Sequence, residues 1–216
     1  MHRGPRVKTR VVGLFVFVSL LGMGCAHMAD PMLEDKVLHP PIVGNADIEI
    51  DGEINEAAWR AALARDDFTF PWRDKKPPQT LYHVFMHESH LYFAYVVTDK
   101  DIVVADPQDG ESSVAQGDRV EFFYASTPEL DNYYCLEIDP DGNVLDYQAA
   151  HYRRFDDTWD CPGIEVATSR WRKGYLVEGR IPLESLRLAV GEVTGVSTAL
   201  LFGLYRAEYY LSLIHI

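Results

Sequence analysis

Short runs in which apolar and polar residues alternate, or in which β-branched and aromatic residues follow one another, recur over most of the chain. Such runs are typical of β-strands, because successive side chains of a strand point to opposite faces of a sheet. Gly, Pro, Asp or Asn turns close the runs. The pattern predicts a first strand that begins at Ile48, and further strands near residues 80–87, 91–98, 119–124, 133–138, 144–147, 164–169, 175–181 and 196–205.

The order of these elements predicts an all-β domain. No stretch alternates a strand with a long helix, which argues against a parallel α/β sheet and favours hairpins within an antiparallel, jelly-roll-like β-sandwich over residues 45–210. One short helical segment is expected at 53–64, where Trp59 and Leu63 have helical spacing. We expect Trp59 to close one end of the sandwich as a buried plug rather than to contact a ligand.

Residues 1–24 have the features of a signal peptide and are expected to lie outside the fold. A basic stretch precedes an apolar run at 11–21, which is too short for a permanent transmembrane helix. The sequence LLGMG before Cys25 is similar to a bacterial lipobox, which predicts lipidation of Cys25; an ordinary secretory signal cleaved near Ala26 is the alternative. Residues 25–44 would then tether an exported domain to a membrane, facing the periplasm or the cell exterior, and the lipid would be the only membrane contact.

Charge narrows the classes of partner. Without residues 1–24 the chain keeps 16 basic and 33 acidic residues, a formal charge of −17. Such a surface repels the phosphates of nucleic acids, which are therefore excluded as partners. Neutral glycans, cations and basic proteins remain.

Two cysteines remain if Cys25 carries lipid. An even number of cysteines in an exported protein predicts a disulfide between Cys135 and Cys161. Two unrelated thiols, one packed in a strand and one in a loop, are the alternative.

An acidic residue between aromatic residues stands out in the segment GDRVEFF, residues 117–123. Strand alternation places Arg119, Glu121 and Phe123 on one face. A buried carboxylate is costly unless it is paired, so Glu121 should point into a ligand groove or at a structural partner such as Arg180 or Arg206.

Five segments carry a resemblance to a known family: DGEINEAAW, HLYFAYVVTDKDI, GDRVEFF, YYCLEIDPDGNVLD and GYLVEGRIPLESL. Their order resembles carbohydrate-binding module family 9, which lies within the wider set of DOMON-like sandwiches that bind sugars or haem. The resemblance implies binding of an oligo- or polysaccharide without catalysis, in association with polysaccharide processing. It also implies that Glu121 points at sugar hydroxyls.

The aromatic platforms of a sugar site are less evident. The family has a tryptophan where this chain has Ala115, and a second one near the end of the domain, beyond the last matching residue here. Trp72, Trp159, Tyr147 and Tyr152 are the available substitutes. The expected carbohydrate contacts are therefore Glu121, Arg119, Trp159, Trp72 and Arg206. Residues 211–216 are expected to be a non-native tail on a truncated reading frame, with a true edge strand as the alternative.

Other chemistries have weaker support. His83, Met86, His87 and His90 raise the alternative of a DOMON-like haem or redox module, although His83 and His87 on one extended strand lie about 13 Å apart, too far to share an ion. Residues 139–143, DPDGN, are better explained as a β-turn than as a calcium loop, and a structural calcium elsewhere has no predicted position. No nucleophile or phosphate-binding motif is present, so no enzyme activity and no other cofactor are expected; a glycoside hydrolase fragment is the remaining alternative.

Overall fold

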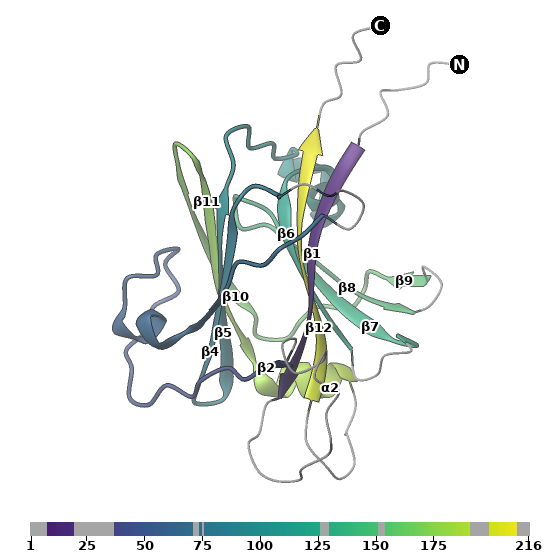
Figure 1. Cartoon of the computed structure of the whole chain (residues 1–216). Coiled ribbons are helices and arrows are strands. Elements are labelled where there is room, and N and C mark those ends of the chain that lie inside the picture. Colours follow the sequence, from purple (N-terminus) through teal and green to yellow (C-terminus); the bar gives the residue numbers. More distant parts are fainter. Residues whose placement is uncertain are drawn as a thin grey trace, which may run out of the picture.

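Two β-sheets face each other in a computed structural model, which describes residues 8–19, 37–70, 74, 76–125, 130–150, 154–190 and 199–210 (Figure 1). The seven-stranded sheet has the order β2-β1-β12-β6-β7-β8-β9, and the five-stranded sheet the order β10-β11-β5-β4-β3. Neighbouring strands are antiparallel except for β1 and β2. The strands are β1 (Lys8–Ser19), β2 (Val37–Leu38), β3 (Leu63–Arg65), β4 (Thr80–His87), β5 (His90–Thr98), β6 (Arg119–Ala125), β7 (Tyr133–Ile138), β8 (Val144–Ala150), β9 (Arg154–Asp156), β10 (Glu165–Trp171), β11 (Gly174–Pro182) and β12 (Ala199–Tyr210).

The structure confirms the predicted antiparallel sandwich. Strands β4 and β7 have the predicted bounds, and the other predicted strands from residue 80 onward agree to within a few residues. The strand expected at Ile48 is wrong, because residues 48–56 are described as loop. Strands β2, β3 and β9 and the helix α2 (Leu183–Val190) were not predicted. Two or three residues are too few for these strands to show a period.

Aromatic and aliphatic side chains of both sheets meet in one core. Phe93 of β5 stacks on Phe122 of β6 across the sheet interface, with ring centroids 5.9 Å apart. Within the five-stranded sheet, Tyr82 and Tyr95 make an edge contact at 4.9 Å. These side chains are almost fully buried, so the inward faces of the two sheets are closed by packing. Any ligand site must therefore use an outward face or an end of the sandwich.

The N-terminal strand β1 pairs with β12 along its whole length, from Lys8 opposite Tyr210 to Ser19 opposite Ala199 (Figure 1). The sequence predicts a signal peptide here that lies outside the fold, whereas the structure gives this segment a place in the seven-stranded sheet. Export and removal of residues 1–24 stay predictions. Cys25 and residues 211–216 lie outside the described part of the chain. No helix among the described residues is long and apolar enough to cross a membrane.

The outward face of the five-stranded sheet is covered by the segment before β3. The short 3-10 helix η1 (Ala57–Ala61) places Trp59 edge-on against Phe85, 4.8 Å between centroids. The indole Nε1 of Trp59 donates to Glu178 of β11 at 3.2 Å, and the backbone N–H groups of Asp51 and Gly52 donate to the other oxygen at 3.1 and 2.9 Å. Trp59 is 5 % exposed. The structure therefore confirms that Trp59 is buried as a plug in a short helical segment. It covers the outward face of the five-stranded sheet rather than one end of the sandwich, and the helical segment is shorter than the predicted 53–64.

The turn at residues 139–143 is also as predicted. Asp139 accepts hydrogen bonds from the backbone N–H groups of Asp141 and Asn143, at 2.8 and 3.0 Å, and from the side-chain amide of Asn143. An aspartate that bonds its own backbone in this way stabilises a tight turn. Both Asp139 oxygens are thus occupied by the β7–β8 turn itself.

Candidate functional site

The outward face of the seven-stranded sheet carries the residues around Glu121. In β6 the side chains of Val120, Phe122 and Tyr124 belong to the core between the sheets, so Arg119, Glu121 and Phe123 point outward, as the alternation predicts. The strand register sets Glu121 between Tyr205 of β12 and Glu137 of β7. Two carboxylates therefore lie directly opposite each other on neighbouring strands.

Arg119 holds these two carboxylates together. Its Nη2 lies 2.8 Å from Oε1 of Glu121, and its Nε donates to Oε2 of Glu137. Its Nη1 donates to the backbone oxygens of Ala115 and Gly117, both at 3.2 Å. The structural partner predicted for Glu121, Arg180 or Arg206, is therefore wrong. Arg119 lies two residues from Glu121 on the same face, which makes it the nearer cation.

Tyr147 of β8 completes the polar set, which we call the Glu121 cluster: Arg119, Glu121, Glu137 and Tyr147. The Tyr147 hydroxyl donates to Oε1 of Glu137 at 3.0 Å. Burial, and then the charge of Glu137, raise the pKa of Glu121 to about 7, against the opposing effect of Arg119. Burial raises the pKa of Tyr147, so its hydroxyl stays a donor at neutral pH. Exposure is 5 % for Glu121 and 6 % for Glu137, so the carboxylates are set into the sheet.

Aromatic rings flank the Glu121 cluster on the same face. Phe123 meets the edge of Tyr205 at 5.3 Å, and it lies 6.1 Å from Tyr133. Further along the face, Phe155 of β9 lies edge-on to Tyr147 at 5.3 Å and is 59 % exposed. The cluster therefore sits between half-buried rings on one side and an exposed ring toward the sheet edge.

The sequence reasoning named only part of this face. It missed Glu137, Tyr205 and Phe155 as neighbours of the site, and proposed Tyr147 only as a substitute platform. The alternation within YYCLEID places Glu137 on the same side of its strand as Cys135. That signal gives a face within one strand, but only the β6–β7 and β6–β12 registers show that these side chains meet Glu121.

Two of the other predicted contacts lie elsewhere. Trp159 is half-buried and packs on Tyr134 at 4.8 Å, against the core between the sheets. Arg206 is fully buried and points inward, where it pairs with Asp99 at 2.8 Å and Glu208 at 2.7 Å. The prediction that Arg206 contacts a ligand is wrong, since its guanidinium joins β12 to the end of β5. Trp72 and Tyr152 lie outside the described residues.

The two described cysteines are free thiols, so the predicted Cys135–Cys161 disulfide is wrong. Cys135 packs with Tyr147 and Ala149 on the outward face of β7, whereas Cys161 belongs to the inward core. The sheet itself separates the two sulfur atoms. Burial raises the pKa of both thiols, that of Cys161 to about 12, so both are held as unreactive thiols.

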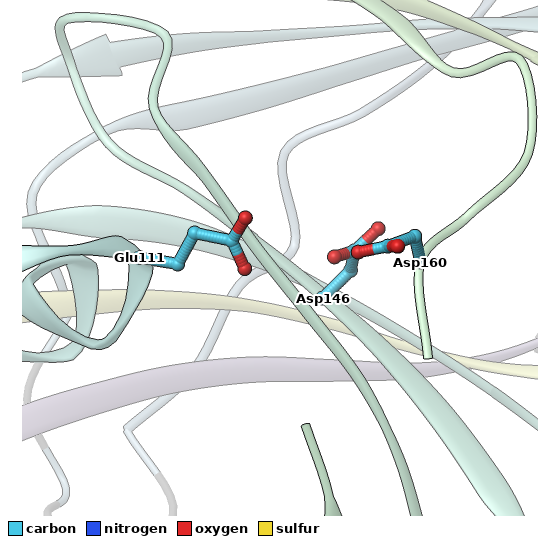
Figure 2. A group of neighbouring side chains, drawn as sticks. All are labelled: Glu111, Asp146 and Asp160. Carbon is cyan, nitrogen blue, oxygen red and sulfur yellow. The ribbon is translucent and has the colours of Figure 1, made fainter. Parts of the chain in front are cut away.

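One group of carboxylates could hold a metal ion. Oxygens of Glu111, Asp146 and Asp160 lie within 4.8 Å of one another, and Figure 2 shows the three side chains turned toward a shared space. Burial and the charge of Asp160 raise the pKa of Asp146, while the backbone N–H of Cys161 donates to it at 2.6 Å. Hard oxygen ligands of this kind suit calcium. A structural calcium stays a prediction, and these are the carboxylates that could take part in it.

Among the described residues, Met86 does not come together with His87 or His90 as the haem alternative would require. Met86 is buried in the inward core, whereas the cross-strand pair His87 and His90 lies near Tyr92, whose ring packs in the outward cluster of the five-stranded sheet. His87 bonds the backbone oxygen of Val43 at 2.9 Å. A methionine and these histidines on opposite sides of one sheet cannot ligate the same iron atom.

Comparisons with known proteins agree with the sequence resemblance. Residues 50–201 match the model of the family described as carbohydrate family 9 binding domain-like. A search of characterised proteins by sequence gave no match.

Similar solved structures have low sequence identity to this chain. A candidate carbohydrate-binding protein from Bacteroides uniformis is 14 % identical, with a TM-score of 0.53 over 82 % of this chain and 94 % of that one. A family 9 module from Caldicellulosiruptor kristjanssonii, solved with cellotriose, is 15 % identical, with a TM-score of 0.46 over 76 % and 83 %. The chain belongs to the carbohydrate family 9 binding domain-like family.

Proposed function

We propose that this protein binds carbohydrate without catalysing a reaction, through the outward face around the Glu121 cluster. The observation that carries the proposal is the cluster itself. Two carboxylates and an arginine lie between aromatic rings on the outward face of a sheet, in a chain of a carbohydrate-binding family. Acidic groups and rings are the two kinds of contact that a sugar uses.

The chemistry of a pyranose fits this combination. Its C–H faces are apolar and stack on aromatic rings, while its hydroxyls donate and accept hydrogen bonds around the rim. Phe123 is two residues from Glu121 on the same strand, and Tyr205 lies opposite Glu121 on the neighbouring strand β12. A sugar held by these rings presents hydroxyls to the Glu121 carboxylate. Phe155 offers a third ring toward the sheet edge for a longer oligosaccharide.

The cellular setting is part of the same proposal. The basic and apolar start of the chain and the sequence before Cys25 support export and a lipid anchor. A surface charge of −17 after residue 24 keeps such a protein soluble beside its membrane and away from polyanions. We place it outside the cytoplasm of a bacterium, tethered by lipid, where it holds oligo- or polysaccharide for enzymes that process it.

Calorimetric titration tests the proposal. The wild type is titrated with glucose, cellotriose, xylotriose and mannotriose up to millimolar concentration, after its fold is verified by circular dichroism. Glu121→Gln removes the charge and should weaken binding by about 1.5–3 kcal/mol, the range for hydrogen bonds to a charged group. Glu184→Gln, at an exposed position of α2, is the matched control and should bind as the wild type does. A folded wild type that gives no heat with any of these sugars would refute the proposal.

A further inference from the structure

We infer that the Glu121 cluster selects sugars that bring hydrogen-bond donors and positive charge, so that amino sugars bind better than neutral sugars and uronic acids are rejected. The inference rests on the proposed function and concerns the class of sugar that this face takes. It follows from the hydrogen-bonding capacity that the cluster has left after its internal contacts are made.

Four of the five N–H groups of the Arg119 guanidinium are already committed, which leaves too few for a second bidentate pair. Each nitrogen of the Arg119 guanidinium has an acceptor: Nε and Nη2 on the two carboxylates, and Nη1 on the backbone oxygens of Ala115 and Gly117. The Tyr147 hydroxyl donates to Glu137. A ligand carboxylate would need donors of the kind that arginine usually supplies in a bidentate pair. Arg119 cannot supply them without giving up a contact within the sheet.

Acceptor capacity, in contrast, is left over at Glu121. Both oxygens of Glu137 accept hydrogen bonds, one from Arg119 and one from Tyr147. At Glu121 only Oε1 is engaged, by Arg119, and within the described part of the chain Oε2 accepts no hydrogen bond. An ionised carboxylate has room for several donors. The unfilled place in the cluster therefore calls for a hydroxyl or an ammonium group.

The charge of the cluster points the same way. When both carboxylates are ionised, the single guanidinium leaves one negative charge in excess. Burial, and then the charge of Glu137, raise the pKa of Glu121 to about 7. An ammonium group beside Glu121 would offset the excess charge and favour the ionised form, whereas a uronate would bring a third carboxylate to the same place. In a partly desolvated site both effects are stronger than they would be in water.

A matched set of β-1,4-linked trisaccharides tests the inference. Trimers of glucose, glucosamine, N-acetylglucosamine and glucuronic acid differ at one substituent per ring and are titrated calorimetrically at pH 6.5 in about 0.05 M and about 0.5 M NaCl. The glucosamine trimer should bind about tenfold more tightly than the glucose trimer at low salt, and the preference should shrink at high salt. N-acetylation, which removes the ammonium charge, should abolish the preference, and the glucuronate trimer should bind at least tenfold more weakly than glucose.

The variant Glu121→Gln separates the cluster from the acidic surface as a whole. It should bring the glucosamine trimer to the affinity of the glucose trimer. A preference that survives in Glu121→Gln would assign it to general surface charge and overturn the inference. Equal binding of all four trimers by the wild type would also overturn it and leave the proposed function intact. Binding of none by a folded protein would refute the proposed function itself.

Discussion

The two outward faces of the sandwich each bury a glutamate whose pKa is raised to about 7 by burial, but among the described residues only Glu178 has donors on both carboxylate oxygens. Glu178, on the five-stranded sheet, accepts from the Trp59 indole and from two backbone N–H groups of the covering segment. Glu121, on the seven-stranded sheet, is held by Arg119 through one oxygen. The difference lies in what covers each carboxylate, since both sit on an interior strand of their sheet.

This contrast separates a structural acid from a candidate binding acid without reference to the residue type. A buried carboxylate needs hydrogen-bond donors or a cation. For Glu178, the segment that carries Gly52 supplies the donors. Gly52 has a φ of +85°, and a Cβ there would come within 2.7 Å of the Thr168 backbone. On the Glu121 side, within the described part of the chain, one oxygen accepts from Arg119 and the other has no donor, which is the oxygen that we propose a ligand satisfies.

The largest expected effect is a loss of stability from a change on the outward face of the five-stranded sheet, which Trp59 covers. Trp59→Ala removes the plug, its contact with Phe85 and the indole donor of Glu178. A buried tryptophan replaced by alanine costs about 3–5 kcal/mol, so the free energy of unfolding in urea should fall by that amount. Sugar binding by the folded fraction should not change, since the two faces are separated by the core. An equal loss of binding would show that the faces are not independent.

A smaller effect is expected from the pH dependence of stability. The pKa of Glu178 is near 4.5 in the unfolded chain and about 7 in the folded one. The folded state therefore binds its proton more tightly, and the stabilisation that protonation gives is complete at low pH and lost as the pH rises from about 4.5 to about 7.

Glu178→Gln should remove this contribution, on the order of 2 kcal/mol between pH 5 and pH 8. Urea unfolding at several pH values measures it, with Glu184→Gln as the control for an exposed glutamate. Glu121→Gln should also reduce the dependence of stability on pH between pH 5 and pH 8, because the pKa of Glu121 is shifted in the same direction. An unchanged slope in Glu178→Gln would mean that its carboxylate is not buried in solution.

The smallest effect is expected from reducing agent. With Cys135 and Cys161 as free thiols on opposite sides of a sheet, dithiothreitol should shift the melting temperature by less than about 1 °C. Both thiols should resist alkylation in the native protein and react after unfolding. A mature domain two hydrogens lighter than its reduced form would restore the disulfide. Rapid native labelling of Cys135 alone would show that the outward face of the seven-stranded sheet opens around it.

Period-two patterns predicted most of the strands from residue 80 onward, but not which residues meet on neighbouring strands. The alternation in RVEFFYA correctly placed Arg119, Glu121 and Phe123 on one face, and β4 and β7 have the predicted bounds. Arg206 was misplaced because alternation gives the relative side of a residue within a strand, not which side faces the core. The disulfide prediction was wrong for a different reason: an even number of cysteines carries no information about a sheet that separates two thiols. Pairing of Arg119 with Glu137 depends on register, which only the folded sheet sets.

The comparison of the two glutamates is tested most directly by one pair of variants measured in one assay. Glu121→Gln and Glu178→Gln are matched in chemistry, in burial and in the direction of their pKa shift. In calorimetric titrations with cellotriose, Glu121→Gln should weaken binding by about 1.5–3 kcal/mol, while Glu178→Gln should bind as the wild type does. Loss of binding in Glu178→Gln, or full binding in Glu121→Gln, would contradict the assignment of the sugar site to the outward face of the seven-stranded sheet.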